Sequence, residues 1–103
     1  MKQINSNVKK IALGKTIRYF RIANDIKAKK LAEELRCTTA YISEVEKGRK
    51  NVTVENLKNL AEVFKVKASD ICYIQECLIE KNWDYQEAMI EILKICISYR
   101  KNN

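Results

Sequence analysis

Residues 28–47, AKKLAEELRCTTAYISEVEK, contain the pattern that decides the fold. Apolar side chains stand at positions 4, 8, 10, 15 and 18 of this window, namely Leu31, Leu35, Cys37, Ile42 and Val45. Position 5 is the small residue Ala32, which lets two backbones approach closely. This spacing is typical of two short helices that cross steeply. The apolar residues hold the second helix from behind, so its polar front is free to enter a DNA major groove.

The rest of the chain predicts further helices and no sheet. It has no proline and only two glycines, whereas strand-and-turn architectures need more frequent breaks. Thr38 and Thr53 are suitable N-caps, and Gly48 suits the left-handed position that ends a helix. Apolar periodicity gives six expected helices, at about 8–23, 28–35, 39–47, 54–64, 69–80 and 84–100.

Positive charge is concentrated in the first half of the chain. The net charge is +7 over 103 residues, yet residues 1–53 hold 13 Lys/Arg against 5 Asp/Glu, and residues 54–103 hold 7 against 8. Such a concentration of positive charge creates an electrostatic field that attracts polyanions, so DNA, RNA and anionic membranes are the candidate partners.

Catalysis and metal binding have little support in the sequence. The chain has no histidine, so the commonest general base and the usual triads are missing. The cysteines form no Cys-x-x-Cys pair and are expected to be reduced thiols; they are Cys37, Cys72, Cys77 and Cys96. We therefore expect no enzymatic activity, no metal and no cofactor.

Targeting segments are not expected either. No run approaches the roughly 18 apolar residues of a membrane span. The first residues, MKQINSNVKK, lack the apolar core of a signal peptide. A cytoplasmic protein is expected.

Four segments, in order, resemble the Cro/phage-repressor helix-turn-helix family, also called the xenobiotic-response-element family. They are IRYFR (17–21), KKLAEEL (29–35), TTAYISEVEKGRK (38–50) and VENLKNLAEVF (54–64). The resemblance runs from about Leu13 to Ile71 and implies a five-helix, lambda-repressor-like bundle. It also implies a DNA-binding transcriptional regulator that is usually dimeric. The expected fold is all-α, with a helix-turn-helix domain over 8–80 and an additional C-terminal helix over 84–100.

The resemblance implies that one face of the helix after Thr38 contacts bases. The matching residues are Thr39, Ala40 and Glu44, with Ser43 beside them. Threonine and alanine methyl groups can contact the thymine methyl group, and a carboxylate can accept a hydrogen bond from cytosine N4. Glutamine, asparagine and arginine, which make bidentate base contacts, are missing from these positions. Direct readout is therefore expected to be weak, with DNA shape carrying more of the specificity.

The phosphate contacts are expected around this helix. Three residues match the family's phosphate-binding loop after it: Arg49, Lys50 and Asn51. The family usually has glutamine at the start of the second helix, where this chain has Ala28 surrounded by cations: Lys27, Lys29 and Lys30. We expect charge to replace the amide contact there, which would steepen the dependence of binding on salt.

The resemblance assigns structural roles as well. Arg21 and Glu46 match an ion pair that ties the first helix to the end of the recognition helix and directs the arginine toward a phosphate. Arg36 stands where the family has the glycine of the turn, so a left-handed conformation costs roughly 1 kcal/mol there. Tyr41 either packs at the edge of the core or reaches a phosphate through its hydroxyl group.

The C-terminal helix carries two apolar rows. The first row is Tyr85, Met89, Ile92, Cys96 and Tyr99, and the second is Ile90, Leu93 and Ile97. One row can cover the protein's own core, which leaves the other exposed unless a second chain covers it. Both rows are candidates for a dimer interface that aligns two recognition helices with half-sites one helical turn apart.

The favoured function is a sequence-specific, dimeric DNA-binding repressor. One alternative is an antitoxin or another interaction module, in which the C-terminal helix receives a different protein. A second alternative is a membrane-surface binder, which needs a basic helix face opposite an apolar one. The C-terminal helix has few positive charges, so this last alternative has the least support. The helix could also fold wholly into its own bundle.

Overall fold

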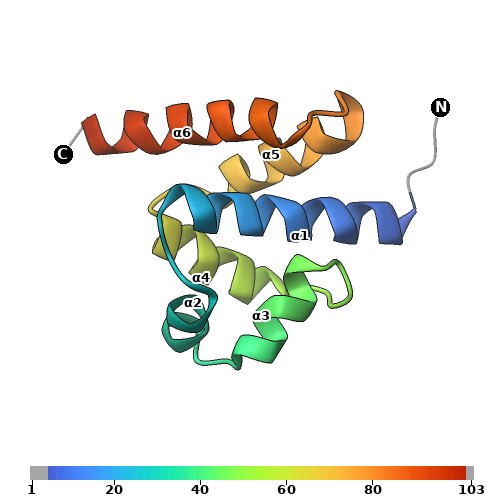
Figure 1. The fold of residues 1–103 in the computed structure, drawn as a ribbon, viewed down its shortest axis with the longest axis vertical. Helices are drawn as coiled ribbons and strands as arrows, with labels where there is room; N and C mark the ends of the chain where they lie inside the picture. Colours follow the sequence, from blue (N-terminus) through green and yellow to red (C-terminus); the bar gives the residue numbers. More distant parts are fainter. Residues whose placement is uncertain (1–4, 102–103) are drawn as a thin grey trace.

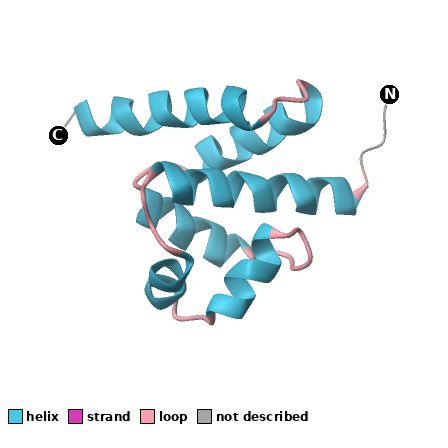
Figure 2. Ribbon diagram, in the orientation of Figure 1, coloured by secondary structure: helices cyan, strands magenta, loops and turns pink. Residues whose placement is uncertain are grey.

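The computed structural model describes residues 5–101, and this part of the chain forms six helices and no strand (Figures 1 and 2). The helices are α1 (Ser6–Ala23), α2 (Ala28–Leu35), α3 (Thr39–Glu46), α4 (Val54–Phe64), α5 (Ala68–Glu80) and α6 (Tyr85–Lys101). The all-α prediction is confirmed, and the helix ends differ from the expected ones by at most two residues.

Local side-chain contacts fix several helix ends. Thr38 Oγ1 accepts a hydrogen bond from Tyr41 N, and Thr53 Oγ1 accepts one from Asn56 N, both at 3.0 Å. Gly48 follows α3 with a φ of 77°, a conformation that glycine adopts at little cost. The predicted caps therefore form because they depend on residues only a few positions apart.

Arg36 ends α2 in the left-handed conformation, with φ 56° and ψ 45°. The next amide, that of Cys37, donates to Ala32 O at 2.9 Å, so the turn closes as it would with glycine. The side chain at this position thus costs some stability without changing the path of the chain into α3.

All six helices contribute to one hydrophobic core. Phe20 and Phe64 stack at its centre with 5.7 Å between their ring centroids. Around them lie other fully buried side chains, namely Ile17, Leu31, Ile42, Ile71, Ile74 and Ile92. The predicted units 8–80 and 84–100 therefore share this core.

Packing of α6 corrects part of the predicted dimer interface. Ile92 is 0% exposed and Cys96 is 3% exposed, because both pack into the core of their own chain. Neither can form an interface with a second chain. Burial also raises the pKa of the Cys96 thiol. The first apolar row is the one that covers the protein's own core.

The ends of this first row are also engaged within the chain. Tyr85 lies edge-on against Tyr19, with 5.0 Å between the ring centroids. Tyr99 donates from its hydroxyl group to Asp70 Oδ2 at 2.6 Å, and this hydrogen bond raises the pKa of Tyr99. The second row is the more exposed of the two, since Ile90 is 57%, Leu93 42% and Ile97 51% exposed. In the first row Tyr85 is 46% exposed, whereas Ile92 and Cys96 are buried.

Helix α6 and the pair α2–α3 lie on opposite sides of the molecule. Figure 1 shows α6 along one side, α2 and α3 on the other, and α1 and α5 between them. The end of α6 is tied to the loop after α1, because Arg100 Nη2 donates to Asn24 Oδ1 at 2.6 Å. In residues 5–101 no helix combines the length and the hydropathy that crossing a membrane requires.

Candidate nucleic-acid interface

Helix α3 presents a polar face because its apolar face is buried. Ile42 is 2% and Val45 3% exposed, and both pack into the core. Thr39 and Ala40 are exposed, and two more predicted base-contacting residues are half-exposed, namely Ser43 and Glu44. The structure therefore brings the predicted base-contacting residues to the surface of one helix.

Gly14 sets the distance between α1 and α3. A Cβ atom at this position would lie 2.3 Å from the carbonyl oxygen of Val45 and 3.0 Å from that of Glu46. Only glycine lets the two backbones come so close. Sequence reasoning gave Gly14 no role, although a glycine inside a helix costs about 1 kcal/mol and so signals a packing reason.

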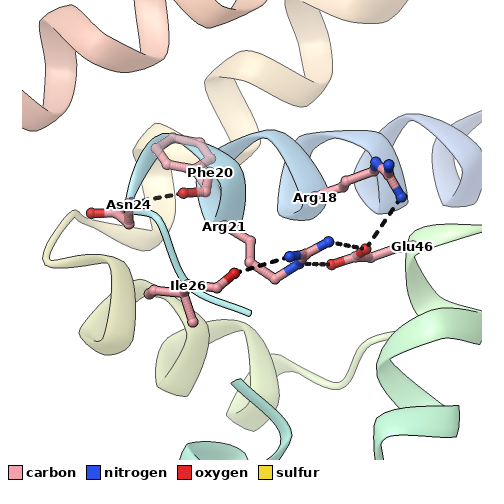
Figure 3. Close-up of polar contacts among 6 residues, drawn as sticks. All are labelled: Arg18, Phe20, Arg21, Asn24, Ile26 and Glu46. Carbon is pink, nitrogen blue, oxygen red and sulfur yellow. Dashed lines mark hydrogen bonds and ion pairs between the residues drawn. The ribbon is translucent and has the colours of Figure 1, made fainter. Parts of the chain in front are cut away.

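Arg21 and Glu46 join α1 to the end of α3 (Figure 3). Arg21 Nε donates to Glu46 Oε2 at 2.7 Å, and Nη2 donates to Oε1 at 3.0 Å. Arg21 Nη1 donates to the carbonyl oxygen of Ile26 at 2.9 Å. The side chains are 14% and 6% exposed. Arg21 thus fixes the positions of α3 and of the loop before α2 at the same time.

Arg18 belongs to the same cluster, and sequence reasoning missed it. Its Nη1 lies 3.9 Å from Glu46 Oε1, and its side chain is 56% exposed (Figure 3). Arg21 is largely buried and bonded to protein atoms, so Arg18 is the more accessible cation here. The signal for it was its position three residues before Arg21 in IRYFR, which places both on one side of α1.

Tyr41 supports the loop between α3 and α4. Its hydroxyl group donates to the carbonyl oxygen of Asn51 at 3.2 Å and accepts from Asn56 Nδ2 at 3.4 Å. The ring packs against the edge of the core, and the hydroxyl group makes its hydrogen bonds within the chain. The loop that carries Arg49, Lys50 and Asn51 is held in place from behind.

Glu44 and Arg49 form an ion pair on the surface. Arg49 Nη1 lies 3.4 Å from Glu44 Oε2, and their side chains are 65% and 37% exposed, respectively. An exposed pair of this kind is weak, so each group can exchange its partner for a ligand at little cost. Glu44, which is predicted to accept a hydrogen bond from a base, is thus a neighbour of Arg49, which is predicted to donate one to a phosphate.

Exposed cations precede and follow α3 along the chain. Arg49 and Lys50, both exposed, follow its C-terminal end, and the exposed cations at the start of α2 are Lys27, Lys29 and Lys30. Lys30 shares its charge with Glu34, whose Oε1 lies 3.2 Å away. Ala28, the first residue of α2, is half-buried and leaves the start of this helix to the lysines. A polar helix flanked by positive charge fits the major groove and the phosphates that border it.

Comparisons with known proteins agree with this geometry. A helix-turn-helix family model matches residues 17–71, which include α2 and α3. Two solved structures of the clp gene regulator ClgR from Corynebacterium glutamicum are similar. One has a TM-score of 0.66 and 29% identity and covers 84% of this chain and 90% of that chain. The other has a TM-score of 0.59 and 33% identity and covers 61% and 81%. No curated protein sequence matches the chain.

Proposed function

The chain belongs to the Cro/C1-type helix-turn-helix family of DNA-binding transcriptional regulators, and from this premise we propose that it is a repressor that binds DNA as a homodimer. The observation that carries the proposal is the exposed polar face of α3, held by buried Ile42 and Val45 and flanked by cations. Its similarity to the clp gene regulator ClgR supports a role in gene regulation.

We propose that α3 contacts bases through Thr39, Ala40, Ser43 and Glu44. The ion pair between Glu44 and Arg49 suggests how the contact forms. When a phosphate takes over Arg49, the Glu44 carboxylate is released and can accept a hydrogen bond from cytosine N4. Base and phosphate contacts would then form together, since the same ion pair has to open for both.

The proposed phosphate contacts surround α3. They come from Lys27, Lys29 and Lys30 at the start of α2 and from Arg49, Lys50 and Asn51 in the loop after α3. Arg21 was also expected to contact a phosphate, but its guanidinium group is 14% exposed and bonded to Glu46 and Ile26. We therefore propose that Arg21 positions the surface, and that the exposed lysines and Arg49 bind the phosphates.

The proposed dimer interface is the exposed row of α6, formed by Ile90, Leu93 and Ile97. Three large apolar side chains exposed in a row on one helix favour association. The half of the chain that contains them is nearly neutral, so two copies can approach without strong repulsion. A two-fold axis running from the α6 side toward the α3 side would present both α3 helices to one DNA, at half-sites roughly 34 Å apart.

Ile97→Glu should dissociate the dimer. A two-fold interface would bury the new carboxylate twice, so we expect the dimer Kd to rise by roughly 100-fold while the circular dichroism spectrum stays unchanged. Sedimentation equilibrium at tens of micromolar measures the effect. The wild type should also lower transcription from a promoter that overlaps its binding site, and Ile97→Glu should relieve this repression.

Ser98→Glu is the matched control, because Ser98 is exposed on the same helix but lies outside the row. This variant should remain dimeric. A wild type that is monomeric at tens of micromolar, or an Ile97→Glu variant that dimerises as well as the control, would refute the α6 interface. A stable complex with a different protein, through the same row and without self-association, would favour the antitoxin-like alternative.

A further inference from the structure

The contacts proposed so far leave part of the positive charge of the first half without a role. Three lysines of α1, namely Lys9, Lys10 and Lys15, contribute to the excess of cations in residues 1–53. Lys9 and Lys10 belong to the first half of α1, which packs against the loop between α3 and α4, and Lys15 lies just beyond it. A Cβ atom at Gly48 in this loop would lie only 2.8 Å from Ile11 Cα. The phosphate-binding loop and the start of α1 therefore form one continuous surface.

An open notch of about 200 Å³ lies between the start of α1 and this loop. Its walls are formed by Ser6, Lys9, Lys10, Leu13, Asn51, Val52 and Gln75. The main chain of this part of α1 is fixed, because Gln75 Nε2 donates to the carbonyl oxygen of Lys9 at 3.0 Å. The wall formed by α1 is thus tied to α5, and the wall formed by the loop after α3 is held by Tyr41.

The side chains of the notch can donate hydrogen bonds and carry positive charge. No acidic residue lines it, and Lys10 has no ion-pair partner among residues 5–101. The Ser6 hydroxyl group and the Asn51 amide group can add donors. Lys9 is less suitable, because the neighbouring cavity that it also lines contains Glu76. An ammonium group with neutral donors beside it matches a phosphate oxygen.

We propose that Lys10, with Ser6 and Asn51, binds a phosphate of the DNA backbone next to those held by Arg49 and Lys50. The inference rests on the proposed phosphate contacts of this loop and extends the footprint from the helix-turn-helix unit onto α1. It also gives one of the three unassigned lysines of α1, Lys10, a function. A free phosphate ion offers the same chemistry, so the experiment has to separate the two.

The test is the salt dependence of duplex binding by the full chain. Lys10→Gln should lower the slope of log K against log salt by about 0.9, the value expected for one lost phosphate contact, and equally for all DNA sequences. Lys10→Arg should keep the wild-type slope. The matched control is Lys15→Gln, since Lys15 lies on the same helix but lines a different groove, with Tyr19, Trp83 and Tyr85. This control loses the same charge and should keep the slope.

The possible outcomes are distinct. If Lys10→Gln and Lys15→Gln have the same slope, the inference is overturned, whereas the proposed contacts of Arg49 and Lys50 remain testable by their own variants. If the wild type binds no duplex, the proposed function itself fails. A titration with inorganic phosphate alone tests whether the notch binds the free ion instead of a DNA phosphate. Millimolar binding that depends on Lys10, together with an unchanged DNA slope, would overturn the DNA contact in favour of a free-ion site.

Discussion

Replacing Gly14 with alanine should lower the free energy of unfolding by about 3 kcal/mol, the upper range for overpacking a close contact. The new methyl group would lie 2.3 Å from the carbonyl oxygen of Val45, and backbone cannot move aside as the end of a side chain can. In an exposed helix the same substitution would stabilise by up to about 1 kcal/mol. The sign of the effect therefore tests the close approach of α1 and α3, and urea denaturation measures it.

Lys15→Ala is a suitable control, since Lys15 is exposed one residue further along α1. Its effect should stay within about 0.5 kcal/mol, as for most surface substitutions. A Gly14→Ala variant as stable as the wild type, or more stable, would contradict the α1–α3 contact. A folded but displaced α3 in this variant should also bind duplex DNA more weakly.

Glu46→Gln should cost about 3 kcal/mol of unfolding free energy, because it leaves a largely buried guanidinium group without its counter-charge. Glu46 accepts two hydrogen bonds from Arg21, and a second arginine, Arg18, lies 3.9 Å from the same carboxylate. Glutamine keeps the shape of the side chain but can accept only one of the two bonds as before. Thermal or urea denaturation would give the loss directly.

The exposed pair between Lys30 and Glu34 provides the comparison. Its side chains are 63% and 48% exposed, so Glu34→Gln should cost less than about 0.5 kcal/mol. Equal losses for the two variants would show that the Arg21–Glu46 pair does not hold α3 to α1. A large loss confined to Glu46→Gln would show that burial, and not the mere presence of an ion pair, gives this contact its effect.

The helices and their ends could be predicted because their causes are local. Apolar spacing of three and four residues marks each helix, and Thr38 and Thr53 each accept a hydrogen bond from the amide three residues further along the chain. The crossing of α2 and α3 was also predictable, since the small residue Ala32 and the buried Ile42 fall at fixed positions of one window.

Long-range contacts were predictable only in part. Both rows of α6 are apolar, so the sequence cannot tell which row faces the core; that depends on how α6 packs against α1 and α5. Ile92 was therefore assigned to an interface although it is fully buried. The inward role of the Tyr41 hydroxyl group depends on Asn51 and Asn56, which a turn and a second helix bring to it.

Binding of duplex DNA by α3 and the cations next to it is the central prediction. It is tested most directly by selecting fragments from random duplex DNA with the purified chain and titrating the selected sequence against salt. We expect log affinity to fall linearly with log salt. Lys50→Glu should weaken binding to all sequences alike, whereas Thr39→Ala or Glu44→Gln should change the sequence that is selected. Failure to bind any duplex at low salt, even after selection, would contradict the account.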